Sequence, residues 1–507
     1  MKKRIISIAL SLLTIAIIAT GCVNSNNANT GNNGSSENSG DTSEKGEAPT
    51  INVCLPTLGN VTDVAKVEDA INAITEDKYN LKIKLTYVEF GNWTQQMNML
   101  LTGNEADIFL AYGTPLVSYV KNGQLLVLDD YYENASSEFK EATEKFLTED
   151  VLKCTTIDGK LYSITNYRNQ GDGITLNIDE DIAAEFGMKA GQKVSLEEIG
   201  DFFEKAHAKY PEKYAIVPQA PGMMTNAGWS WDSLADIKYL GVLASDDSTE
   251  VISLLDNPDF LELISHTRMW YEKGYMMADC LNTTEFSTAM LAQGKAISHF
   301  DNGPIYENEE LCTKNGFIQV IAVDGFAQTS AVSGLTYAIN SNTKNPDASW
   351  KMFEVIFSDL EVATLLGCGI ENEHYFYNED GLIAYPEGVD RSTSGYGTLN
   401  QNWLYPNMSL APIWEDRGAK TDIFLDEFNA NMKRNKTFGF SFDSSEVVDE
   451  YSACSNVMDK YYTALMMGAI DPDEVLDTFR QELEDAGLEK VMEAKRTQLN
   501  AWLSENE

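Results

Sequence analysis

Residues 51–55, Ile51-Asn52-Val53-Cys54-Leu55, predict a short strand that ends at Pro56, and they open an alternation of strands and helices. Residues 64–74 then carry apolar side chains on one helical face, and residues 82–87 alternate between apolar and polar side chains, as a half-buried strand does. A second amphipathic helix follows from Trp93, and the stretch Asp107-Ile108-Phe109-Leu110 begins a third strand. This order predicts a parallel sheet in an α/β fold.

The ends of the predicted strands locate the first candidate site residues. In parallel α/β sheets the ligand binds beyond the carboxyl ends of the strands. Thr57 follows the first strand and Tyr112 follows the third. We therefore expect Thr57 and Tyr112 to contact a ligand.

The alternating pattern breaks near residues 158–169, and a second α/β run begins at Ile174. Two α/β units joined in this way would leave a cleft between them. We therefore place part of the ligand site at the junction and at the end of the strand 297–300 in the second run. The candidates at these two places are Asn166, Tyr167, Arg168 and Asp301.

Aromatic side chains supply further candidates. Aromatic rings bring a large contact area with few torsions to freeze, so rings that stand beside polar groups are candidates for ligand contact. Trp229, Trp231 and Asp232 lie together in a loop-rich stretch, and Trp403 and Tyr405 lie in another stretch without periodicity. In both stretches the alternative is that the rings pack in the core, and both alternatives stay open at this point.

The first residues predict export. Three cations, an apolar run and a group of small residues within residues 1–21 have the pattern of a secretory signal peptide. Cys22 then resembles the lipidated cysteine of a bacterial lipobox, so we expect a lipid anchor there. Residues 22–49 are rich in Asn, Ser, Gly and Glu, which predicts a disordered tether.

The net charge of the chain restricts the classes of partner that it can bind. The formal net charge is −41. A surface this acidic disfavours nucleic acid and anionic lipid headgroups, whereas a neutral ligand is compatible with it. The four His residues show none of the spacings of a zinc site, and the sequence has neither a phosphate-binding loop nor a dinucleotide fingerprint. We therefore expect no metal and no cofactor.

Several stretches, taken in their order along the chain, resemble the family 1 extracellular solute-binding proteins of ATP-driven sugar importers. They are Trp93–Asp107, Gly123–Asp130, Phe286–Phe300, Asn345–Lys351, Phe438–Asp443, Gly468–Pro472 and Ala486–Leu503. The resemblance implies a two-lobed venus-flytrap fold of type II, of the periplasmic-binding-protein class, with a helical C-terminal extension. It also implies that the two lobes close on a saccharide.

The resemblance and the patterns together predict the domain organisation. We expect the N-terminal lobe to contain residues 50–168 and 324–365, and the C-terminal lobe to contain residues 169–323 and 366–430. Residues 431–507 are expected to form a helical C-terminal region.

This organisation predicts a binding protein that makes and breaks no covalent bond. We expect a monomer that is held by its lipid on the outer face of the cell membrane, captures an oligosaccharide and delivers it to the permease subunits of an ABC transporter. One alternative is an exported, membrane-tethered enzyme that degrades glycans. Such an enzyme needs two carboxylates across a cleft, and with 78 Asp and Glu in the chain no pair stands out. A second alternative is a receptor for a non-sugar solute, such as a peptide or a polyamine.

Overall fold

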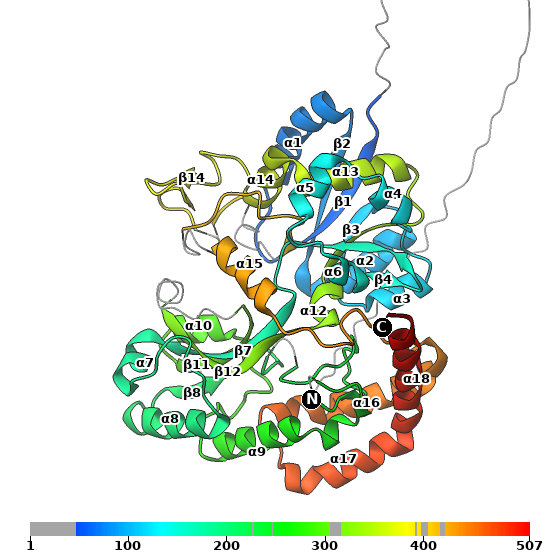
Figure 1. Cartoon of the computed structure of the whole chain (residues 1–507). Helices are drawn as coiled ribbons and strands as arrows, with labels where there is room; N and C mark the ends of the chain where they lie inside the picture. The colour runs from blue at the N-terminus through cyan, green and yellow to red at the C-terminus, as the bar shows by residue number, and fades with distance from the viewer. Residues whose placement is uncertain are drawn as a thin grey trace, which may run out of the picture. The chain divides into compact units, whose positions relative to one another are not determined.

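The computed structural model describes residues 47–225, 228–245, 247–304, 316–390, 393–396, 404–415 and 421–506. Within these ranges the buried side chains form two separate hydrophobic cores. Each core is built on its own sheet, and Figure 1 shows the strands of the two sheets in different parts of the ribbon. We call them the first core and the second core. The predicted α/β class is confirmed.

The first core surrounds a five-stranded sheet in the order β2-β1-β3-β13-β6. The strands are β1 (Thr50–Thr57), β2 (Lys82–Glu89), β3 (Ile108–Ala111), β6 (Ser163–Thr165) and β13 (Thr336–Ile339). Strand β1 pairs in parallel with β2 and β3, as the alternating pattern predicts. Strand β13 arrives from much later in the chain and pairs antiparallel with β3 and β6.

The helices of the first core follow the apolar faces seen in the sequence. Helix α1 (Val64–Tyr79) buries Val67 and Ile71, and Asn80, in the left-handed conformation, caps its end. Helix α13 (Pro346–Ser358) buries Trp350, whose ring stacks on Phe353 at a centroid distance of 5.4 Å. The other helices and small strands of this half are α2 (Trp93–Thr102), α3 (Leu116–Lys121), α4 (Asp129–Glu133), α5 (Ser137–Thr143), α6 (Glu149–Lys153), β4 (Thr156–Ile157), β5 (Lys160–Leu161), α12 (Thr329–Ser333), α14 (Leu360–Cys368), β14 (Phe376–Tyr377), β15 (Ile383–Ala384) and α15 (Thr421–Asn431).

The second core surrounds a four-stranded sheet in the order β12-β7-β11-β8. The strands are β7 (Gly171–Asp179), β8 (Tyr214–Val217), β11 (Ala296–Gly303) and β12 (Phe317–Ala327). Strand β11 runs parallel to β8 and antiparallel to β7. Helix α8 (Leu196–Lys209) begins with a capping box formed by Ser195 and Glu198. The remaining elements are α7 (Glu180–Phe186), β9 (Val242–Leu243), β10 (Val251–Ile252), α9 (Pro258–Glu272) and α10 (Ser287–Ala292).

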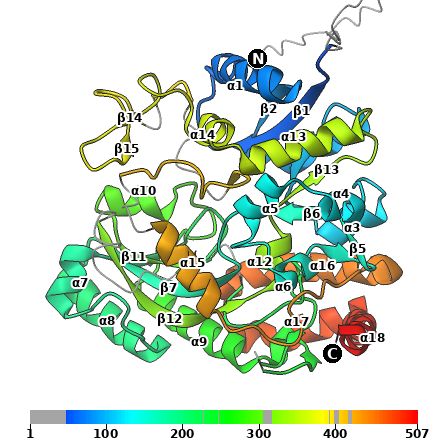
Figure 2. The ribbon, with the colours of Figure 1, turned by 45° about the horizontal axis from the view of Figure 1, so that its top comes forward.

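Three helices close the chain and pack on the second core (Figure 2). They are α16 (Val448–Met466), α17 (Pro472–Ala486) and α18 (Leu488–Asn506). Helix α17 has Asp471 as its N-cap and Pro472 in its first turn, and Gly487 ends it in the left-handed conformation. The helical C-terminal extension is therefore present where the sequence places it. None of the helices in the described ranges combines the length and the apolar character that a membrane span requires.

The described residues within 366–430 pack differently from our expectation for this stretch. We expected them in the C-terminal lobe, but Ile383, Tyr405 and Trp414 from this stretch lie in the first core. The physical reason is that α14 packs on α1 and keeps the chain on the first sheet after Cys368.

Three chain segments cross between the two cores beside one another. Gln170 lies on the first crossing, Gln328 on the second and Lys433 on the third. The Gln328 N–H donates to the Gln170 carbonyl at 3.3 Å, and the Ala327 N–H donates to the Lys433 carbonyl at 2.8 Å. A Cβ added to Gly171 would collide with the Phe326 carbonyl, so the crossings approach too closely for a larger residue there.

Candidate ligand-binding site

An aromatic pair lies at the carboxyl edge of the first sheet. Because β1, β2 and β3 are parallel, their carboxyl ends meet at one edge. Phe90, directly after β2, stacks on Tyr112, directly after β3, at a centroid distance of 4.6 Å and an interplanar angle of 29°. Both rings are half-buried, and burial raises the pKa of Tyr112. Leu58 is 46% exposed after the end of β1, so this edge offers apolar surface.

Thr57 lies at the same edge but serves the turn. Its side chain is 5% exposed. The Thr57 hydroxyl donates to the Gly59 carbonyl at 2.8 Å and accepts from the Gly59 N–H at 3.1 Å. Its hydroxyl is therefore engaged in shaping the loop that follows β1, and ligand contact by Thr57 stays a prediction.

A group of polar side chains lies where β8 and β11 end and β7 begins. Asp301 accepts from the Asn177 amide at 3.1 Å, from the Asn302 N–H at 2.9 Å and from the Gln219 amide. Asp172 accepts from the Asn169 amide at 2.7 Å. We call the following residues the polar cluster: Arg168, Asn169, Asp172, Asn177, Gln219, Asp301 and Asn302.

The charges of the polar cluster are partly shielded from water. Burial raises the pKa of Asp301 to about 6. Burial also raises the pKa of Asp172, and the positive charge of Arg168 opposes that rise. Within the described part of the chain, the Arg168 Nε is buried without a hydrogen-bond partner. The cluster therefore combines amide donors, two carboxylates and one guanidinium donor.

The three candidates at the junction, Asn166, Tyr167 and Arg168, have different surroundings. Arg168 joins the polar cluster through its charge interaction with Asp172. Tyr167 instead turns to the first core, where its hydroxyl donates to Asp426 at 2.8 Å and the Lys145 ammonium lies 4.2 Å from the ring centroid. Asn166 is buried at 1% exposure. Arg168 thus connects the junction to the polar cluster through its interaction with Asp172.

The tryptophan stretch packs inside the second core. The Trp229 ring meets Phe300 edge-to-face at 4.8 Å, and the Trp231 ring meets Phe260 edge-to-face at 5.6 Å. The Asp232 carboxylate accepts from the Leu234 N–H at 2.8 Å, and burial raises its pKa. This packing favours the alternative that the two rings are core side chains, and their contact with a ligand stays a prediction.

In the second aromatic stretch, the described ring of Tyr405 is also buried in a core. Tyr405 is 1% exposed and belongs to the first core, where burial raises its pKa. Trp403 lies outside the described residues. The structure therefore favours core packing for Tyr405.

One group of side chains has the composition of a metal site but is built around a lysine. Potential ligand atoms of Asp63, Glu373 and His374 lie within 4.8 Å of one another. The Lys66 ammonium lies 3.3 Å from Asp63 and also contacts Glu373. His374 accepts the Ile370 N–H at its Nδ1, at 2.9 Å, so its Nε2 carries the proton and points it at Asp63. A metal at this nitrogen would require the opposite tautomer, so we assign the group to binding Lys66.

Comparisons with known proteins agree with this architecture. Residues 69–366 match the family described as bacterial extracellular solute-binding protein, and residues 436–504 match a domain of unknown function (DUF3502). A carbohydrate ABC transporter substrate-binding protein of Streptococcus pneumoniae serotype 4 is 22% identical over 444 residues, which cover 85% of this chain and 87% of that protein.

Solved structures show the same fold. The N-glycan transport solute binding protein NgtS of Streptococcus pneumoniae has a TM-score of 0.76 at 19% identity, over 90% of this chain and 100% of that one. Its complex with Man5GlcNAc has a TM-score of 0.71 at 20% identity, over 90% and 99% of the two chains. A solute-binding protein of Bifidobacterium longum infantis, described as binding HMO, has a TM-score of 0.58 at 15% identity, over 90% and 99%.

The family match covers residues 69–366, which is more than half of the chain. The protein therefore belongs to the bacterial extracellular solute-binding proteins.

Proposed function

We propose that this protein is the substrate-binding component of an ABC importer and that it captures an oligosaccharide. The observation that carries the proposal is the pairing of two kinds of surface at strand ends. The first sheet ends in the stacked rings of Phe90 and Tyr112, and the second sheet ends in the polar cluster. The relatives named for carbohydrate transport and glycan binding support the same reading.

The mechanism is binding and release. The aromatic pair gives apolar area to a sugar face, while the amides and carboxylates of the polar cluster bind hydroxyl groups. A ligand that touches both surfaces stabilises the arrangement in which both contacts form. The protein then delivers the sugar, with its bonds intact, to the permease subunits in the membrane and acts as a monomer.

The charge of the cluster favours a neutral sugar. The polar cluster contains two carboxylates, Asp172 and Asp301, and one cation, Arg168, so a uronate or a sialylated glycan would add a third negative charge. Neutral oligosaccharides are therefore the ligand class that the site fits best.

A glycan-degrading enzyme is the second candidate, because two carboxylates with raised pKa values lie in one cluster. A glycosidase uses one such carboxyl as an acid and needs the second free to act as nucleophile or base. Asp301 already accepts hydrogen bonds from Asn177, Gln219 and Asn302. This arrangement favours a fixed acceptor of hydrogen bonds over a reacting group.

A thermal-shift scan of the chain without its signal peptide tests the proposal. The panel contains Man5GlcNAc and other neutral oligosaccharides, an alginate oligosaccharide, peptides and polyamines. A ligand at 100 times its dissociation constant adds about 2.7 kcal/mol of stability, which gives a clear rise in melting temperature. A rise with a neutral sugar that is recovered intact supports the proposal. A rise confined to peptides or polyamines, or conversion of the sugar, contradicts it.

Replacing Tyr112 with alanine is expected to weaken binding of that sugar about two- to tenfold, since a stacked ring contributes about 0.5–1.5 kcal/mol. Tyr377→Ala is the matched control, because this ring is 46% exposed and lies on β14, away from the strand ends. Calorimetric titration of both variants measures the two affinities. Equal affinities would remove the aromatic pair from the site.

The family is extracellular, and we propose further that Cys22 carries a lipid that anchors the protein to the outer face of the cell membrane. Cys22 and most of the tether that we expect over residues 22–49 lie outside the described residues. Cys22→Ser is expected to release the protein from the membrane fraction, because no acyl chains then hold it. Detergent-phase partitioning of cell extracts checks this. A variant that stays in the detergent phase would place the anchor elsewhere.

A further inference from the structure

A loop of the second core is held in an unfavourable backbone conformation. We call residues 233–241 the strained loop. Leu234, Ala235 and Tyr239 have φ values of 60°, 61° and 56°. Side chains other than glycine crowd the backbone at such angles. Three left-handed residues in one short loop persist only where the surroundings hold them.

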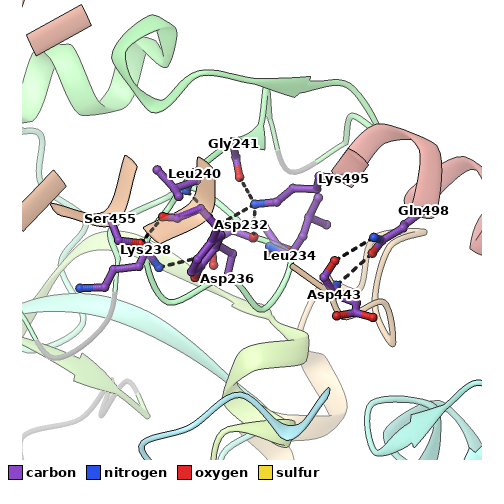
Figure 3. A network of polar contacts seen from close by, with 12 residues as sticks. Asp232, Leu234, Asp236, Lys238, Leu240, Gly241, Asp443, Ser455, Lys495 and Gln498 are labelled. Atoms are coloured by element: carbon purple, nitrogen blue, oxygen red, sulfur yellow. Dashed lines mark hydrogen bonds and ion pairs between the residues drawn. The ribbon is translucent and has the colours of Figure 1, made fainter. Parts of the chain in front are cut away.

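A buried lysine of the last helix stabilises this backbone conformation through hydrogen bonds. The Lys495 ammonium of α18 donates to Asp236 at 2.8 Å, to the Gly241 carbonyl at 2.8 Å and to the Ser233 carbonyl at 3.3 Å (Figure 3). These three bonds use all three N–H groups of the ammonium. Lysine is almost never fully buried unless it is paired, and Lys495 is 0% exposed. Its three acceptors fix both ends and the middle of the loop.

Asp236 links the Lys495 ammonium to the backbone of the strained loop. Its carboxylate accepts the Lys238 N–H at 2.9 Å and the Leu240 N–H at 3.0 Å. It also accepts the Tyr451 hydroxyl of α16 at 2.7 Å. Two helices of the C-terminal region therefore meet on one carboxylate of the strained loop.

The C-terminal region contacts the loop backbone directly as well. The Phe442 N–H donates to the Leu234 carbonyl at 3.1 Å, and the Phe442 ring lies 4.9 Å from the Lys495 ammonium. The next residue, Asp443, exchanges two hydrogen bonds with the Gln498 amide of α18, at 2.9 and 2.8 Å. The segment beside the loop is thus fixed to the same helix as Lys495.

The strained loop adjoins the candidate ligand site. The charge of Asp172, in the polar cluster, contributes to the raised pKa of Tyr239 in the loop. Trp229, which leads into the loop, packs on Phe300, the residue before Asp301. A shift of the loop would therefore act on β11 through the contact of Trp229 with Phe300, next to Asp301.

The same C-terminal segment is also fixed to the first core. The Gly439 N–H donates to the Thr329 hydroxyl at 2.8 Å, and Lys121 pairs with Asp443 at 3.3 Å. The segment thus has contacts on both sides, and the strained loop rests against a support that does not depend on the second core alone.

We propose that the C-terminal region, residues 436–504, positions the strained loop, that Lys495 is the positioning residue, and that the region thereby shapes the second-sheet side of the ligand site. This assigns a role to the segment that matches a domain of unknown function. The part that concerns the ligand rests on the proposed function, whereas the part that concerns the loop does not.

Hydrogen–deuterium exchange of the full chain, measured by mass spectrometry, tests the positioning role. Lys495→Met keeps an unbranched apolar chain of similar size up to the position of Cε and removes the ammonium with its three donors. We expect the amides of residues 233–243 to exchange about tenfold faster or more, since opening the loop no longer breaks these bonds. A smaller increase is expected at the end of β11, while peptides from β1 and β3 keep their rates.

Two further variants separate positioning from general stability. Lys490→Met changes a lysine of the same helix that is exposed and pairs with Glu450, and it should leave the loop unchanged. Tyr451→Phe removes one donor to Asp236 without leaving a buried charge unpaired, and it should accelerate exchange in the same loop to a smaller extent. Unchanged exchange in residues 233–243, or an increase of the same size throughout the second core, would overturn the proposal. The experiment needs no sugar, so it stands whether or not the proposed ligand binds.

Discussion

Asp236→Ala is expected to lower the free energy of unfolding by about 3–5 kcal/mol, the range found when one partner of a buried ion pair is removed. The cause is the Lys495 ammonium, which stays 0% exposed and loses its counter-charge. The Lys238 and Leu240 N–H groups lose their acceptor at the same time. Urea denaturation followed by tryptophan fluorescence measures the change.

Asp459→Ala is the matched control for this variant. Asp459 also pairs with a lysine, Lys238, but its side chain is 62% exposed. An exposed ion pair contributes about 0–1 kcal/mol, so the control should unfold close to the unmodified protein. If both variants had the same urea midpoint, the Asp236 pair would contribute no more than a surface pair.

Gly171→Ala is expected to destabilise the protein by about 3 kcal/mol, near the upper end of the usual range for overpacking. The added Cβ would meet the Phe326 carbonyl, the Met432 sulfur and, at 2.7 Å, the Ala327 Cα. Backbone atoms on a neighbouring crossing cannot turn aside as a flexible side chain can. The crossings must therefore separate, which disturbs Arg168 and Asp172 on either side of Gln170 and Gly171.

The effect of Gly171→Ala should appear in both melting temperature and oligosaccharide affinity. Gly91→Ala is the control for stability, because a Cβ at Gly91 meets nothing within 4 Å. Calorimetry on both variants measures the melting temperature and the oligosaccharide affinity separately. Melting temperatures that agree within a degree would show that the crossings tolerate the extra methyl group.

Local patterns predicted the first strands and helices, and they led to one residue of the candidate site. The first three strands and two helices follow from apolar periodicity, and the rule of strand ends led to Tyr112. The same rule, applied to β2, would have led to Phe90, which we did not single out. Periodicity says which residues form a strand, and position beyond the strand says which residues are available to a ligand.

Contacts between residues distant in sequence determine the side-chain orientations and groupings that periodicity cannot predict. Trp229 and Trp231 have the composition of a sugar platform, but their orientation depends on Phe300 and Phe260, which are distant in sequence. Gln219 and Asn177 reach Asp301 only because β7, β8 and β11 share a sheet. The position of residues 366–430 likewise depends on contacts between α1 and α14 that no local pattern encodes.

The two cores are interleaved along the chain, and this sets the order in which they can be completed. The first core draws its buried residues from Ile51 to Tyr167 and again from Ala327 to Phe438, while the second draws its own from Ile174 to Val320 and again from Phe440 to Leu499. During export the chain emerges N-terminus first. The first sheet must therefore wait for β13, and the second core must wait for the last helix, so nearly the whole polypeptide has to cross the membrane before either half can finish folding.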